Sequence, residues 1–427
     1  MDKRYNQFYM AKIKTIEARE ILASGGAPTI EVTITLESGT TGEASISYGA
    51  SAGSREAFVL LDGDKSRYNG KGMLNAIKNI LEIITPTLIG KEGQREIDKL
   101  MVDLDGTENK SKLGGNAILA VSMAYARAEA NERKIELYEY LREEFELPKM
   151  TNLPKPMMVM IEGGKHADET TDLQEYLVSA LGNKTAAENI RMEMEIYEAL
   201  KKILKTEGLS INVGNEGAFA PNNIISNEKP MEYLVEAIKN AGYIPGVEAG
   251  ISIDAAASEF YDLGNMIYDL RIEQKKISSE ELINYYASWM DKYPFVSWED
   301  MLSEFDWENW PKLLEKIGRK FPLIADDLTV TNTKLWQRAI EVKAANAVLI
   351  KLNQAGTVTE TIECGKLAIA NNLWTVVSHR GGGESNDTFM VDLAVAMGSE
   401  YIKCGPTRGE RVAKYNRLMR IAEGMGI

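Results

Sequence analysis

Apolar and polar side chains alternate along the first part of the chain. Residues 13–20 and residues 29–36 both follow the two-residue period that is typical of half-buried strands. The small residues between them, from Ser24 to Pro28, are a turn signal, so the pattern predicts an antiparallel hairpin. A further short strand is predicted over residues 41–47.

The next segment, residues 48–54, consists mainly of small side chains. Its composition suits a plain connecting loop, and the alternative is a mobile lid, because glycine-rich segments bend at low cost. Residues 75–88, 94–103 and 115–130 then show helical periodicity, and the last of these is apolar on nearly every side, which predicts a buried helix.

A hairpin followed by helices predicts an α+β domain. Pro148, Pro154 and Pro156 interrupt the helical pattern, so a domain boundary is predicted there. We therefore expect residues 1–148 to form an N-terminal capping or lid domain and residues 149–427 to form a second domain.

Beyond that boundary, short apolar runs recur, and most of them end at a polar side chain. From Glu299 onward the polar residues that follow successive runs are 24 to 28 residues apart. That is the length of a strand, a helix and two loops in a (β/α)8 barrel. One run begins at its acid instead of ending there, so the first pair of strands is predicted to be irregular. The nine runs carry Glu162, Glu175, Glu216 (after residues 211–213), Asp254, Glu299, Asp326, Lys351, His379 and Lys403.

Acidic and basic side chains at these strand ends should meet. In a (β/α)8 barrel all the carboxyl ends point into one mouth, so Asp326 and Lys351 should face the same space. Asp254 and Glu299 should converge with Asp326, and like charges raise one another's pKa unless something compensates them. A divalent cation would do so, and all-oxygen ligation favours Mg²⁺ over zinc. The alternative is an ion network of these acids with Lys351, Lys403 and Arg380.

A lysine close to a metal and to other cations should have a lowered pKa, which would make Lys351 a usable base. The chain has two histidines, His166 and His379, and both follow strand ends in glycine-containing loops. A single histidine is usually structural, but two at one barrel mouth indicate site residues. Arg380 and the glycines from Gly381 onward resemble an anion cradle, because a guanidinium and flexible backbone N–H groups both bind anions.

Composition limits the classes of partner. The chain has 427 residues, 44% of them hydrophobic, which suits a large buried core. A net charge of −14 without a basic run argues against nucleic acid and anionic membrane surfaces as partners. The two cysteines suit a reducing compartment. The N-terminus lacks a signal-peptide pattern, and no apolar stretch approaches the ~20 residues of a membrane helix, so we expect a cytoplasmic protein.

From about residue 13 to residue 421 the chain resembles the enolase family, the phosphopyruvate hydratases. The resemblance implies an α/β protein in which an N-terminal α+β domain precedes an enolase-type (β/α)8 TIM-like barrel. It also implies a Mg²⁺-dependent lyase of glycolysis and gluconeogenesis that interconverts 2-phosphoglycerate and phosphoenolpyruvate, typically as a homodimer or higher homo-oligomer. The matching stretches include Leu104–Asp105–Gly106–Thr107, Gln174–Glu175, Ser297 with Glu299–Asp300, Asp326–Asp327–Leu328–Thr329, Lys351 with Asn353–Gln354, and Ser378–His379–Arg380.

The resemblance also implies individual roles. Lys351 would remove the C2 proton, and Glu216, assisted by Glu175, would protonate the leaving C3 hydroxyl. A lysine or histidine base opposite a metal-stabilised ene-diolate is general in the enolase superfamily. Two Mg²⁺ ions are implied, the tighter one on Asp254, Glu299 and Asp326 and the second on Ser51. The remaining implied residues are the catalytic His379 and the substrate-binding His166, Gln174, Arg380 (on the phosphate), Gly381 and Lys403.

Several positions differ from the usual enolase pattern. The hairpin turn lacks an acid and an arginine, and Tyr48 and Ala52 stand where hydroxyl residues are usual. Glu162 replaces an asparagine and Asn215 an aspartate, which suggests that an acid has moved from one loop of the mouth to another. Gly381 replaces a serine, and the loop carries one extra glycine.

These changes leave the metal and proton-transfer residues in place but affect the segment 48–54 and the phosphate loop. Two alternatives therefore remain open beside the hydratase. One is a related lyase that acts on another carboxylate. The other is a catalytically idle binding protein, against which the intact Lys351, Glu216 and three acids argue.

Overall fold

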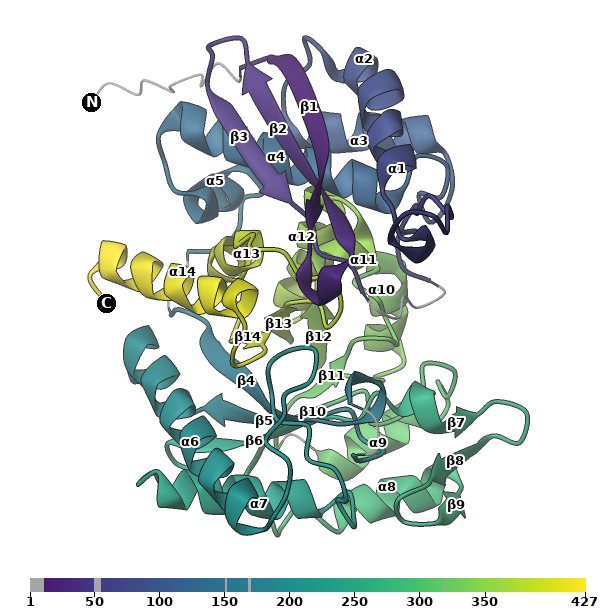
Figure 1. Ribbon diagram of the computed structural model, residues 1–427, viewed down its shortest axis with the longest axis vertical. Coiled ribbons are helices and arrows are strands. Elements are labelled where there is room, and N and C mark those ends of the chain that lie inside the picture. Colours follow the sequence, from purple (N-terminus) through teal and green to yellow (C-terminus); the bar gives the residue numbers. More distant parts are fainter. Residues whose placement is uncertain (1–10, 50–54, 150–151, 168–169, 319) are drawn as a thin grey trace.

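A computed structural model describes residues 11–49, 55–149, 152–167, 170–318 and 320–427. Its upper part in Figure 1 is an antiparallel sheet with helices beside it, and its lower part is a closed barrel. Among the described residues, no helix is long and apolar enough to span a membrane.

The predicted hairpin is confirmed. Strands β1 (Ile13–Leu22) and β2 (Pro28–Leu36) pair antiparallel, and β3 (Thr41–Ser45) adds a third strand, two residues shorter than predicted. The 3₁₀ turn η1 (Ser24–Gly26) joins β1 to β2. Of the segment 48–54, residues 50–54 lie outside the described part, so the lid prediction is untested, and so is Ser51 as a metal ligand.

The three predicted helices of this part are also present. The first, over residues 75–88, consists of α1 (Leu74–Asn79), a π-helical turn (Ile80–Ile84) and α2 (Thr85–Leu88), followed by α3 (Gln94–Asp105). Helix α4 (Gly115–Arg133) is almost entirely buried and packs on the sheet, and α5 (Leu137–Glu144) follows it. A Cβ on Gly42 would lie 2.1 Å from the Ala128 backbone nitrogen, so this close contact of β3 with α4 requires glycine.

Eight strands form the predicted closed barrel. Their order is β10-β11-β12-β13-β14-β4-β5-β6, and β10 pairs with β6 to close it. Strand β5 runs antiparallel to both neighbours, whereas all other pairs are parallel, so the first residue of β5 lies at the end where the other strands finish. The strands are β4 (Lys155–Glu162), β5 (Glu175–Ala180), β6 (Ala249–Asp254), β10 (Phe295–Glu299), β11 (Leu323–Ala325), β12 (Ala347–Ile350), β13 (Trp374–Ser378) and β14 (Tyr401–Cys404).

One predicted strand is wrong. Residues 211–213 make only an isolated bridge, from Val213 to Phe219, and do not join the barrel. Between β6 and β10 the chain instead makes a small antiparallel sheet that the sequence pattern did not predict, with β7 (Tyr261–Asp262), β8 (Ile267–Leu270) and β9 (Lys275–Ile277). The helices of this part are α6 (Ala186–Thr206), α7 (Lys229–Asn240), α8 (Ser279–Ala287), α9 (Trp310–Ile317), α10 (Thr333–Glu341), α11 (Leu352–Ala355), α12 (Val358–Ala370), α13 (Phe389–Met397) and α14 (Gly409–Met425).

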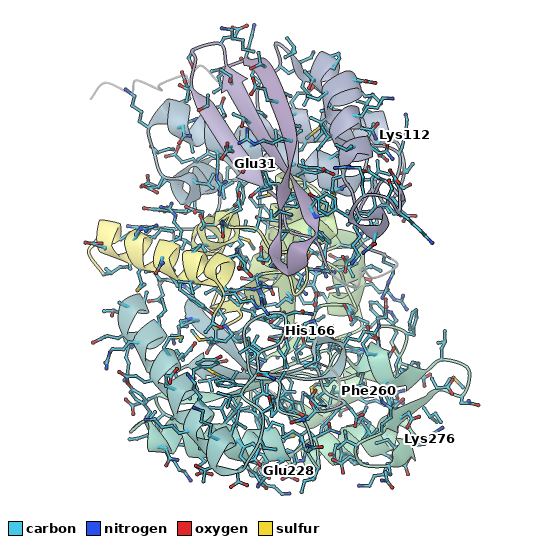
Figure 2. All side chains as sticks on the ribbon, viewed as in Figure 1. Glu31, Lys112, His166, Glu228, Phe260 and Lys276 are labelled. Carbon is cyan, nitrogen blue, oxygen red and sulfur yellow. The ribbon has the colours of Figure 1, made fainter. Side chains whose placement is uncertain are left out.

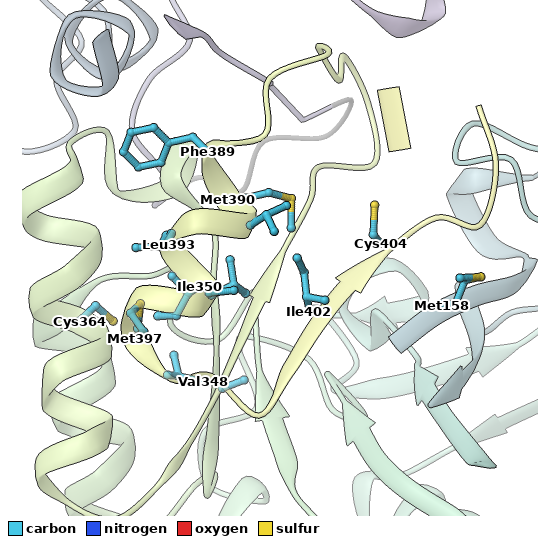
Figure 3. Close-up of a cluster of buried hydrophobic side chains, with 14 of the residues drawn as sticks. Met158, Val348, Ile350, Cys364, Phe389, Met390, Leu393, Met397, Ile402 and Cys404 are labelled. Carbon is cyan, nitrogen blue, oxygen red and sulfur yellow. The ribbon is translucent and has the colours of Figure 1, made fainter. Parts of the chain in front are cut away.

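Alternation along the barrel strands divides the core into two layers. Met157 and Leu349 belong to the cluster that fills the barrel interior, whereas Val348 belongs to the layer between strands and helices. Figure 3 shows part of that outer layer, with Cys364 and Met397 on two helices that lie against the strands. Helices α12 and α13 approach closely because Gly365 has no side chain: a Cβ there would lie 1.8 Å from the Met397 methyl carbon.

The hairpin turn of the N-terminal part contacts the loop after β13. Ser24 Oγ donates to the Gly382 carbonyl oxygen at 2.8 Å and accepts from the Glu384 backbone N–H at 3.0 Å. The turn between β1 and β2 therefore helps to hold a loop that comes some 360 residues later. The exact domain boundary at residue 148 stays a prediction.

Candidate active site

A cavity of about 50 Å³ opens at the carboxyl ends of the barrel strands. His166, one of its lining residues, lies near the middle of the molecule in Figure 2. Two predicted site residues are not among those that line the cavity. Glu299 accepts a hydrogen bond from Lys403, which does line it, and Ser51 lies outside the described residues. The predicted residues that line it are His166, Gln174, Glu175, Glu216, Asp254, Asp326, Lys351, His379, Arg380, Gly381 and Lys403.

Lys403 is the centre of an ion network at one wall. Its Nζ lies 2.8 Å from Asp254 Oδ2, 2.7 Å from Glu299 Oε1 and 2.8 Å from Glu175 Oε2. Burial lowers the pKa of Lys403, but the three carboxylates raise it further, and the net pKa lies well above the ordinary value. β5 contributes Glu175 from its first residue because that strand is reversed, which explains why this acid precedes its apolar run.

Lys351 is bound to Asp326, as the neighbouring strands β11 and β12 predicted. Lys351 Nζ lies 2.5 Å from Asp326 Oδ2, and Gln354 Nε2 donates to Asp326 Oδ1 at 2.8 Å. Burial lowers the pKa of Lys351, but the Asp326 carboxylate raises it, and the net shift is upward. The close anionic partner is the reason for this upward shift, and the lowering expected for a lysine beside a metal ion stays a prediction.

The ion network that was the alternative to a metal site is thus present around both lysines. Arg380 pairs with a further acid: its Nη2 donates to both carboxylate oxygens of Glu56, at 2.8 and 2.9 Å. Glu56 was missed from sequence, because nothing local links it to a loop more than 300 residues away. Gly49 also packs on this guanidinium, since a Cβ there would lie 2.2 Å from Arg380 Nη2.

A group of acids that could hold a metal ion is present, although its membership differs from the prediction. Asp300, Asp326 and Asp327 each offer an oxygen, and these atoms lie within 4.8 Å of one another. Of the predicted trio, only Asp326 belongs to this group, and Asp254 and Glu299 are paired with Lys403. An all-oxygen set at such spacing suits Mg²⁺.

The electrostatics of these acids also suit a cation. Burial and then Asp327 hold the pKa of Asp300 well above its ordinary value, and burial and then Asp326 raise that of Asp327 to about 7. Asp300 Oδ1 and Oδ2 accept the backbone N–H groups of Asp326 (3.0 Å) and Asp327 (2.7 Å). The sequence signal for the two added acids is their position directly after a predicted ligand.

The second wall carries both histidines around Glu216. His166 Nδ1 lies 3.2 Å from Glu175 Oε1 and 3.6 Å from Glu216 Oε1, and His379 Nε2 lies 3.2 Å from Glu216 Oε2. Burial lowers the pKa of each imidazole, but the carboxylates raise it, to about 9 for His166 and about 10 for His379.

Burial in turn raises the pKa of Glu216, but the two histidines lower it far below the ordinary value. An ionised carboxylate therefore lies between two protonated rings. A second glycine contact fixes this wall: a Cβ on Gly381 would lie 2.7 Å from Glu216 Oε1 and 2.8 Å from His166 Cε1. A serine at this position could not be accommodated without moving one of them.

Glu162 and Asn215, the two apparently exchanged positions, do not face each other across the cavity. Neither lines it; Asn215 is exposed and Glu162 is fully buried. Burial and then Glu216 raise the pKa of Glu162 to about 8. The hypothesis of an acid moved from one loop of the mouth to another therefore does not describe this geometry: Glu162 lies behind the loop that carries Glu216.

Comparison with protein families agrees with this architecture. Residues 13–141 match the model described as the enolase N-terminal domain, and residues 150–427 match that of the enolase C-terminal TIM barrel domain. The two matches cover the antiparallel sheet with its helices and the whole barrel with its cavity. The chain therefore belongs to the enolase family.

Proposed function

We propose that the protein is a Mg²⁺-dependent phosphopyruvate hydratase, which interconverts 2-phosphoglycerate with phosphoenolpyruvate and water. Family membership supports a lyase-type enzyme. The observation that carries the finer proposal is that Lys351 and the Glu216–His379 pair line one small cavity. A base for the α-proton and a proton source for the leaving hydroxyl are the two groups that this elimination needs.

The metal-binding part of the proposal rests on the buried acids. Asp254, Glu299 and Asp326 would hold one Mg²⁺, with Asp300 and Asp327 beside Asp326, and Ser51 would contribute to a second. The ion, when bound, stabilises the negative charge that develops on the substrate carboxylate as the weakly acidic α-proton leaves.

The residues of the chain divide the remaining work. Lys351 acts as a base only when Asp326 no longer neutralises it, because that carboxylate raises its pKa. Glu216 carries the proton to the C3 hydroxyl, and His379 at 3.2 Å replenishes it. Arg380, Gly381, Gln174, His166 and Lys403 would orient the substrate, with Arg380 on the phosphate.

We also propose the cytoplasm as its location and a homodimer or higher homo-oligomer as its assembly, from its composition and from the resemblance. The proposed pathway is glycolysis and gluconeogenesis.

A second candidate is a lyase that removes an α-proton from a different carboxylate. One observation favours it: the guanidinium that would hold the phosphate is bound through two hydrogen bonds to Glu56. The Tyr48 ring also packs against the loop that carries this arginine, since it occupies the place where a Cβ on Gly383 would lie. A substrate with another group in place of phosphate would then fit the same base and acid.

One assay tests these functions. Purified protein is mixed with 2-phosphoglycerate and Mg²⁺, and the enol product is followed by ultraviolet absorbance. Turnover that falls about 10²- to 10⁴-fold in Lys351→Ala supports the hydratase, since a general base contributes that much. Lys312→Ala is the control, because its side chain is 59% exposed on α9. Mg²⁺ binding without turnover supports the other lyase, and absence of both supports an idle binding protein.

A further inference from the structure

A buried acid at the end of β4 binds the backbone of the loop that carries Glu216. Glu162 is fully buried, and its Oε1 accepts the backbone N–H groups of Glu216 and Ala218, both at 3.0 Å. Its own backbone N–H donates to the Phe219 carbonyl oxygen at 2.9 Å. Three hydrogen bonds with one residue thus hold the backbone of residues 216–219.

The surroundings leave this loop little room to settle in another position. A Cβ on Gly214 would lie 2.2 Å from Glu162 Oε2, so the carboxyl group packs directly on the loop backbone. On the other side, a Cβ on Gly405 would lie 2.2 Å from the Glu216 carbonyl oxygen. Gly217, at φ +88°, has the Thr407 backbone 2.9 Å from its Cβ position. The loop is therefore held between β4 and the residues after β14.

Glu162 acts on the site through the backbone of the Glu216 loop, because its own side chain lies outside the cavity. Its side chain does not line the cavity, whereas Glu216 does. The carboxylate of Glu216 must meet His379 at 3.2 Å and His166 at 3.6 Å, and a shift of the loop by about an ångström would break both contacts. Loss of the acceptor would also leave two buried N–H groups without their partner, which is unfavourable.

We propose that Glu162 is a positioning residue: its carboxyl oxygen fixes the backbone of residues 216–218 and so holds the Glu216 carboxylate against the two histidines. The effect on turnover rests on the proposed function, in which Glu216 transfers a proton. The effect on the loop does not.

Two variants separate the acceptor from the charge. Glu162→Gln keeps an oxygen that can accept both N–H groups, whereas Glu162→Leu removes it at similar volume. We expect Glu162→Leu to lower kcat for 2-phosphoglycerate about 10- to 100-fold with KM changed less than threefold, because the ground-state contacts to substrate remain. Glu162→Gln should stay within about fivefold of the parent. Glu308→Gln, with a side chain 90% exposed, is the control.

Hydrogen exchange of the peptide that spans residues 214–219, followed by mass spectrometry, gives a second readout that needs no substrate. Exchange of the amides of Glu216 and Ala218 should rise at least tenfold in Glu162→Leu and remain near the parent rate in Glu162→Gln. If the parent does not turn over 2-phosphoglycerate, the proposed function fails while exchange still decides the role of Glu162. The proposal would be overturned if amide exchange in Glu162→Leu were unchanged, or if Glu162→Leu and Glu162→Gln lowered kcat and raised exchange to the same extent.

Discussion

His379 Nε2 lies 3.2 Å from Glu216 Oε2, and both side chains are almost completely buried. With His166 on the other oxygen of the same carboxylate, these contacts lower the pKa of Glu216 and raise the pKa of both histidines. Both histidines beside the cavity are therefore protonated at neutral pH, where an isolated imidazole would be mostly neutral.

The first prediction concerns these protons. Glu216→Gln removes the anion that contributes most to the raised pKa of His379, so this pKa should fall from about 10 toward or below the ordinary value. The pKa of His166 should fall from about 9 by less, because Glu175 at 3.2 Å remains. NMR titration of the histidine ring signals measures this directly, because the chain has only two histidines. Glu308→Gln should leave both titrations unchanged. Unshifted titrations in Glu216→Gln would show that the carboxylate is not the cause.

The second prediction concerns Tyr48 and Gly383, whose backbones exchange hydrogen bonds of 3.0 and 2.9 Å. A Cβ on Gly383 would lie 2.2 Å from the Tyr48 ring, so Gly383→Ala should lower both melting temperature and kcat/KM, the latter about tenfold or more. In a Tyr48→Ala background the ring is absent, and the same substitution should cost little. The two changes should therefore be strongly non-additive in a double-mutant cycle.

A matched control for that cycle is Gly409→Ala, since a Cβ there has nothing within 4 Å. It should be nearly neutral in both backgrounds. If Gly383→Ala lowers the melting temperature and kcat/KM equally with and without the Tyr48 ring, the contact between this ring and Gly383 is not the cause.

The third prediction concerns metal binding. Asp326→Asn and Asp300→Asn each remove a carboxylate from the group whose oxygens lie within 4.8 Å, and each should weaken Mg²⁺ binding about tenfold or more in isothermal titration calorimetry. Asp291→Asn, with a side chain 92% exposed, is the control. Retention of the parent affinity by both site variants would place the ion elsewhere.

The fourth prediction concerns stability and pH. Glu193 on α6 is fully buried, and burial raises its pKa well above the ordinary value. Its contribution to stability is therefore fully present below the unfolded-state pKa and is lost as pH rises through the folded-state pKa. Glu193→Gln cannot ionise, so its melting temperature should exceed that of the parent by more at pH 8 than at pH 5. A constant difference between the two pH values would contradict this.

The sequence alone determined the elements and the list of candidate groups. The hairpin, the buried helix over residues 115–130 and the barrel periodicity are local patterns, and the structure confirms each of them. The strand-end rule of the barrel then brings Asp326 to Lys351 without any knowledge of coordinates. The false strand at residues 211–213 shows the limit of that rule, because three residues carry too little periodicity to separate a strand from a loop.

Only the tertiary structure decided how the charges pair. It joined Arg380 to Glu56, Ser24 to the loop after β13, and Lys403 to three acids from different strands. The strand-end rule placed Asp326 near Lys351, but only the structure showed an ion pair close enough to raise the pKa of that lysine. Ion pairs and close backbone contacts depend on distances between segments far apart in the chain, and these distances are set by packing of the whole fold. Hydrophobic periodicity is a property of neighbouring residues and carries no such information.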